Sequence, residues 1–117
     1  LIELKKGRDG GGDYVAWGLY DCEGRFCGFE RIYDGLNEHG KSDKKVRRYS
    51  MPAQGFAVLG KLDEASRAFV VGGLADGISV HQSTGECVIV VVGENNIPKI
   101  IAQLQAYHPA VEFISAP

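Results

Sequence analysis

The second half of the chain alternates between short apolar runs and longer amphipathic segments. Residues 69–71 and 88–92 are apolar runs, and the second consists of five consecutive β-branched residues. An unbroken apolar run of this length is typical of a strand that is covered on both faces, as in a parallel sheet. The segment between them begins near Leu74 and ends at Gly85, a residue suited to end a helix. The pattern therefore predicts a β-α-β unit.

A second amphipathic segment follows, with apolar residues at the spacing of one helix face. These residues are Ile97, Ile100, Ile101, Leu104 and Tyr107. Asn95 and Asn96 are suited to cap the start of this helix, and Pro98 is tolerated in its first turn. Pro109 ends it, and residues 111–114 are predicted to form a third parallel strand. The order from residue 69 onward is therefore β-α-β-α-β, with right-handed crossovers.

The first half of the chain is richer in aromatic residues that favour strands. Residues 14–20 and 25–32 are predicted to pair as an antiparallel hairpin around a turn at residues 21–24. Residues 55–60 are predicted to form a further strand. The aromatic residues of the first hairpin strand are interpreted as core rather than as a platform for bases. They are Tyr14, Trp17 and Tyr20.

These patterns predict one α/β domain, because 117 residues are enough for one hydrophobic core. Three glycines at residues 10–12 separate an N-terminal segment, residues 1–13, from a single domain at residues 14–117. Residues 14–60 are expected to form its β-rich part, an antiparallel β-hairpin region. Residues 68–117 are expected to form its α/β part, a βαβαβ unit with a parallel sheet.

The region between residues 33 and 50 is polar and charged, and is predicted to form a long loop or the tip of a second hairpin. It holds a dense cluster of basic residues, with Tyr49 beside it. The cluster consists of Lys41, Lys44, Lys45, Arg47 and Arg48. Basic side chains at this density favour contacts with the phosphates of DNA or RNA, and the alternative is a solvated loop.

Composition limits the classes of function. The net charge is −2, so bulk electrostatics does not attract the chain to nucleic acid, and any binding requires a local patch. The sequence has no apolar run of the roughly 20 residues that cross a bilayer, and its first residues lack the features of a signal sequence. We therefore expect a cytoplasmic protein that binds no membrane. Three cysteines, an odd number, fit a reducing compartment better than a set of disulfides.

Residues 69–85, which predict a strand, a glycine turn and a helix, resemble the start of the Toprim fold of DNA primases and primase-helicases from phages, plasmids and mobile elements. Residues 18–25 and 28–32 look like the hairpin that precedes Toprim in that family. Residues 84–85 and 93–96, with the sequences TG and GENN, are similar to two short family signatures. The order and spacing of these motifs imply a Toprim-like fold over most of the chain.

The resemblance implies a Glu at the end of the first Toprim strand and a later Asp-x-Asp pair, which together hold Mg²⁺ for nucleotidyl transfer. Gly72 occupies the position of the Glu, and the sequence ends at Ala116 and Pro117, where the pair would follow. We therefore expect no catalytic residue, metal site or cofactor in this chain, and Mg²⁺ only if other segments supply carboxylates. Asp76 and Glu94 are alternative ligands, but both also suit a structural role near a helix N-terminus.

The carboxyl ends of parallel strands are where α/β sheets usually bind ligands. At this edge Gly72 and Gly73 precede one predicted helix, and Asn95 and Asn96 precede the next. Backbone N–H groups at these positions could bind an anion such as a phosphate. The alternative is that the two glycines simply allow a tight turn between strand and helix.

Together these observations predict a Toprim-like domain without catalytic activity, which acts in DNA replication or mobile-element transfer by binding nucleic acid or a replication protein. One alternative is a fragment of an active primase-helicase whose metal ligands lie outside this chain. Another is a small phage or mobile-element protein that binds and inhibits a protein partner.

Overall fold

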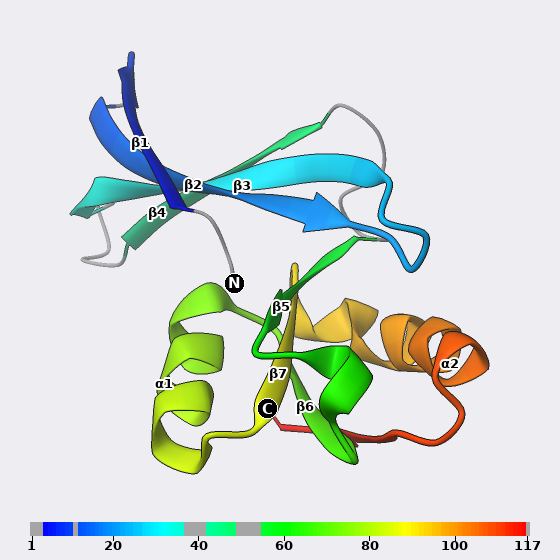
Figure 1. Ribbon diagram of the computed structural model, residues 1–117. Helices are drawn as coiled ribbons and strands as arrows, with labels where there is room; N and C mark the ends of the chain where they lie inside the picture. Colours follow the sequence, from blue (N-terminus) through cyan, green and yellow to red (C-terminus); the bar gives the residue numbers. More distant parts are fainter. Residues whose placement is uncertain (1–3, 11, 37–41, 49–54, 117) are drawn as a thin grey trace.

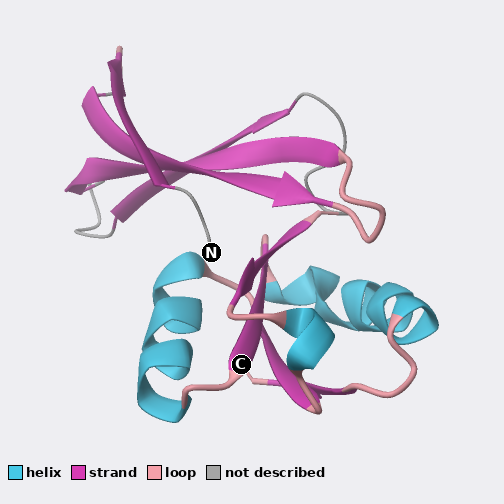
Figure 2. Cartoon of the chain, in the orientation of Figure 1, coloured by secondary structure: helices cyan, strands magenta, loops and turns pink. Residues whose placement is uncertain are grey.

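The computed structural model describes residues 4–10, 12–36, 42–48 and 55–116. Within these ranges, eight strands form one mixed sheet, accompanied by two α-helices and two short 3-10 helices (Figures 1 and 2). The strands are β1 (Leu4–Asp9), β2 (Gly12–Tyr20), β3 (Phe26–Leu36), β4 (Ser42–Arg48), β5 (Phe56–Leu59), β6 (Arg67–Val71), β7 (Cys87–Val91) and β8 (Glu112–Ser115). The helices are η2 (Leu62–Glu64), α1 (Leu74–Thr84), η3 (Glu94–Asn96) and α2 (Ile97–Tyr107). The strand order across the sheet is β4-β3-β2-β5-β7-β6-β8, and β1 also pairs with β2.

The predicted β-α-β-α-β order is confirmed in the second half of the chain. β6 pairs in parallel with both β7 and β8, and Phe69 on β6 is registered opposite Val88 and Ile114. Gly85 follows α1 with a φ of 69°, the left-handed conformation predicted for the residue that ends this helix. Pro98 lies in the first turn of α2, where its missing N–H leaves no hydrogen bond unmade.

The two α-helices pack on opposite faces of this sheet (Figure 1). Ile97, Ile100 and Leu104 of α2 pack in one cluster with alternate residues of β6 and β7, such as Val70 and Ile89. The remaining residues of the same strands, together with Leu74 of α1, form the second cluster. This alternation explains why β7 is buried along its whole length, as its unbroken apolar run predicted.

The predicted antiparallel hairpin is also confirmed. β2 pairs with β3, with Trp17 opposite Glu30 and Gly18 opposite Phe29. Asp21 orders the turn, because its carboxylate accepts hydrogen bonds from the backbone N–H groups of Glu23 and Arg25. The sheet also includes the residues before this hairpin, since β1 pairs antiparallel with β2.

The basic cluster lies on a strand. Residues 33–50 were predicted to form either a long loop or the tip of a second hairpin, and the hairpin is therefore correct. β3 continues to Leu36, beyond the predicted end at residue 32, and β4 returns antiparallel along it. Lys44, Lys45, Arg47 and Arg48 lie on β4, whereas Lys41 is outside the described residues. The loop prediction was wrong because the polar composition concealed a strand at the edge of the sheet, where only one side of the strand is paired.

Candidate functional site

The carboxyl ends of β6 and β7 meet at one edge of the sheet, where the sequence predicted an anion site. An ideal Cβ at Gly72 would lie 2.7 Å from Cγ of Glu94 and 2.8 Å from its backbone nitrogen. The segment after β7 therefore covers the position at which the resemblance expected a catalytic Glu. A larger side chain at Gly72 requires the backbone of Glu94 to move.

The asparagines at this edge serve the loop in which they lie. Asn96 takes the N-cap position of α2, but its side-chain amide donates a hydrogen bond to the carbonyl oxygen of Val92 and makes no cap hydrogen bond. Gly73 is buried at the start of α1, and Asn95 is exposed. The edge thus brings Gly72, Gly73, Asn95 and Asn96 into neighbouring turns. The anion site on these residues stays a prediction.

The acidic residues proposed as alternative metal ligands are exposed. Asp76 lies in the first turn of α1, and Glu94 begins η3. In the described ranges no group of three or more His, Cys, Asp or Glu residues is placed to hold a metal ion.

The three cysteines are free thiols, and desolvation by burial raises the pKa of each. Negative charges add to this effect, since Asp21 and Glu23 lie near Cys22 and Glu86 lies near Cys87. A raised pKa lowers the thiolate fraction at neutral pH, so these side chains are poor nucleophiles. They act as small apolar residues in the core.

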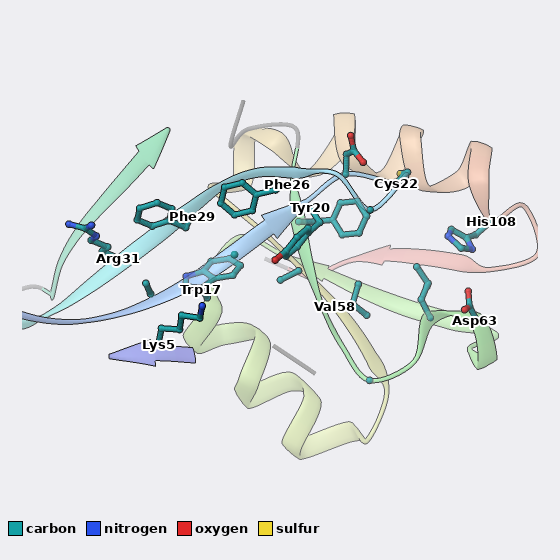
Figure 3. Close-up of a pocket in the computed structure, with 18 of the residues that line it drawn as sticks. Lys5, Trp17, Tyr20, Cys22, Phe26, Phe29, Arg31, Val58, Asp63 and His108 are labelled. Atoms are coloured by element: carbon teal, nitrogen blue, oxygen red, sulfur yellow. The ribbon is translucent and has the colours of Figure 1, made fainter. Parts of the chain in front are cut away.

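A large hollow lies on the same face of the sheet as α2. The helix covers this face at β6 and β7, whereas the hollow lies beside β2 and β3. On β2, the residues that point to this face are Tyr14, Ala16, Gly18 and Tyr20, because Tyr20 is registered opposite Phe56 of the α2 cluster. The described chain encloses a cavity of about 880 Å³ there, between the β2–β3 hairpin, β5 and η2 (Figure 3). This volume is within the range of small-ligand sites.

Aromatic rings form one side of this cavity, which we call the open aromatic face: Tyr14, Tyr20, Phe26 and Phe29. Tyr20 and Phe26 contact each other edge to face, with ring centroids 5.7 Å apart. The ring of Tyr20 bends back over Gly18, 3.1 Å from an ideal Cβ there, so the absence of a side chain at Gly18 makes room for this ring. Figure 3 shows Tyr20, Phe26 and Phe29 beside one another along the two strands.

The prediction that all three aromatic residues of β2 belong to the core was wrong for Tyr20. Trp17 is 1% exposed, and its indole N–H donates a hydrogen bond of 3.1 Å to Oε1 of the buried Glu30. Tyr20 points to the opposite face and is 47% exposed. The pairing of β2 with β5 decides which face of β2 is buried and which is exposed. This pairing cannot be seen in the sequence of the hairpin alone.

Positive charge lies at one end of the cavity. Arg31 stacks its guanidinium over the ring of Tyr14, 4.5 Å from its centroid, and also forms an ion pair with Asp9. Lys5 and Lys6 of β1 line the same end and are exposed. Neither lysine was predicted as a site residue, because their only signal was a pair of adjacent basic residues before the hairpin.

The basic strand β4 runs beside the open aromatic face. Its register places Lys45 opposite Arg31 and Arg47 opposite Phe29. The structure thus pairs the strand that carries four of the five predicted basic residues with β3, and it sets Arg47 opposite Phe29 of the open aromatic face. Asp21 and Asp63 lie at the other end of the cavity. The backbone N–H of Arg25 hydrogen-bonds to Asp21 and lowers the pKa of that carboxyl, which keeps it negatively charged at neutral pH.

No family model, curated protein or solved structure matches this chain significantly. Within the described ranges, no helix is long and apolar enough to cross a membrane. The open aromatic face and the basic strand beside it are therefore the features of the described chain that bear on its function.

Proposed function

We propose that this chain is a Toprim-like domain related to the DNA primases of phages, plasmids and mobile elements, and that it binds nucleic acid in replication or transfer without catalysing nucleotidyl transfer. The parallel pairing of β6 with β7 and β8 supports the fold part of this proposal. Antiparallel pairing of these strands would have argued against it.

One observation carries the binding function: an open aromatic face adjoins a strand with four basic residues. Aromatic rings provide stacking surfaces for bases, and lysine and arginine neutralise phosphates. Because the net charge of the chain is −2, such a local concentration of basic residues is required for binding. The same rings would suit a protein partner, which is the competing function.

The absence of catalysis is supported by the environment of Gly72. The family chemistry requires a carboxylate at this position, and here the backbone of Glu94 lies against it. Mg²⁺ would then be used only with carboxylates from outside this chain, as in the alternative of a fragment of an active primase-helicase.

The proposal is tested by a fluorescence-anisotropy titration of labelled DNA and RNA at several salt concentrations. Replacing Lys45 and Arg47 by Ala should weaken binding and lower the log–log salt slope by about 0.7 to 0.9 for each lost phosphate contact. The matched control replaces Lys61 and Lys99 by Ala, two exposed lysines of the described chain outside the cavity lining.

Both double variants remove two positive charges. If binding depends on the position of these charges and not on the net charge alone, the control variant should bind nucleic acid as the parent protein does. Equal weakening in both double variants would remove β4 from the site. If the parent protein binds neither DNA nor RNA at low salt, the nucleic-acid function is wrong and a protein partner becomes the better proposal.

A further inference from the structure

We propose that the nucleic acid bound by this protein is single-stranded, and that its unpaired bases stack on the rings of Tyr20 and Phe26 in the cavity beside β2 and β3. This inference rests on the proposed function, and it adds the class of nucleic acid and the residues that hold the bases.

The rings of Tyr20 and Phe26 are exposed to solvent. Tyr20 is 47% exposed and Phe26 is 44% exposed, and they are two of the four large hydrophobic residues exposed in the described chain. They lie in contact at an interplanar angle of 68°, so their faces point in different directions. Each ring can therefore present aromatic surface to a separate base, and stacking would remove this surface from water.

Unpaired bases can reach these rings, whereas the bases of a duplex cannot. In a duplex, each base is stacked between its neighbours, so its faces are not available to a side chain. Tyr20 and Phe26 line a hollow in which the small residues Ala16 and Gly18 are also part of the lining, and a flat or convex duplex surface would not enter it. A single strand can turn its bases into the hollow while its phosphates remain outside.

Charge is distributed unevenly around the rings. Exposed Lys5 is registered opposite Ala16 and lies at the end of the cavity nearest Arg31, whereas Asp63 lies at the other end (Figure 3). Phosphates would be repelled by the carboxylate of Asp63 and attracted by Lys5. Asp21 also lines the cavity, but its carboxylate forms an ion pair with Arg25 at 2.9 Å. The backbone of the bound strand is therefore placed along β1 and β4, and its bases extend toward the hairpin turn.

The test uses a fluorescent single-stranded oligonucleotide of about 12 nucleotides and a duplex of the same sequence. One variant replaces both Tyr20 and Phe26 by Leu, which keeps apolar bulk and removes the aromatic surface. The matched variant carries Tyr20→Phe and Phe26→Tyr, which keeps both rings. A third variant, Leu4→Ala, truncates an exposed apolar residue that is registered on the opposite face of the sheet.

We expect the double Leu variant to lose about 5-fold to 100-fold in affinity for the single strand per stacked base, with an unchanged salt slope. The ring-keeping variant and Leu4→Ala should bind as the parent does. The parent should also bind the single strand more tightly than the duplex, a comparison that requires no variant and so does not depend on how the variants fold.

Equal affinity of the parent for the single strand and the duplex would overturn this inference while the proposed function stands. Parent-like binding by the folded double Leu variant would also overturn it. Absence of binding to either oligonucleotide would instead reject the proposed function itself.

Discussion

Gly77 on α1 tests how closely the helix packs against the sheet. An ideal Cβ at this residue would lie 2.5 Å from Cγ2 of Val90 and 3.2 Å from Cγ2 of Val71, both in the buried core. Gly77→Ala gains about 1 kcal/mol of helix propensity, whereas overpacking a filled core costs about 1 to 3 kcal/mol. We expect a net decrease in the free energy of unfolding, measured by chemical denaturation.

Ser83→Ala is the control for this prediction, because Ser83 is exposed on the same helix. Its effect should stay within about 0.5 kcal/mol. A Gly77→Ala variant more stable than the parent would show that α1 does not approach the sheet as closely as described.

Residue types alone do not decide which aromatic side chains form the site. Trp17 and Tyr20 are three residues apart on β2 and therefore point to opposite faces. Alternation is visible in the sequence, but the face that becomes buried depends on β5, which pairs with β2 at Tyr20 and Phe56. The open aromatic face could not be predicted because this contact joins residues far apart in the chain.

At the scale of elements, η3 lies against Gly72 at the edge formed by the carboxyl ends of β6 and β7. Gly72→Glu introduces a side chain whose Cβ would meet the backbone nitrogen of Glu94 at 2.8 Å. We expect this variant to be less stable than the parent and to gain neither Mg²⁺-dependent stabilisation nor primer synthesis, because a single carboxylate is too few for a stable Mg²⁺ site. Thermal unfolding with and without Mg²⁺ measures the first effect.

An increase in the melting temperature of Gly72→Glu on adding Mg²⁺, with none for the parent, would contradict this prediction. It would mean that η3 moves readily and that Asp76 or Glu94 completes a metal site. Metal-dependent primer synthesis by the parent chain would lead to the same conclusion.

The elements differ in how well their sequence predicted them. α2 and β7 were predicted within one or two residues, because their periodicity and flanking residues agree with their burial. β1 and β4 were missed or only suggested, since both are edge strands with mostly polar residues. Their strand structure comes from pairing with β2 and β3, and local sequence carries little of that signal.

At the scale of the whole molecule, one sheet spans both halves of the chain, while its two α-helices cover only the half that contains β6, β7 and β8 (Figures 1 and 2). The parallel half resembles a ligand-binding α/β unit, but its usual binding edge is partly filled at Gly72. The antiparallel half, in which the sequence predicted the basic cluster, carries the open aromatic face and the basic strand. We therefore propose that the ligand binds to the β-rich half.

The most direct test is to map the binding surface by amide chemical shifts in the NMR spectrum of the parent protein, titrated with a single-stranded oligonucleotide. The account predicts the largest shifts on β2 and β3, at residues 16–20 and 26–31, with smaller ones on β1 and β4. Shifts confined to Gly72, Gly73 and η3 would contradict it, because they would place the ligand at the carboxyl edge of the parallel strands instead of on the open aromatic face.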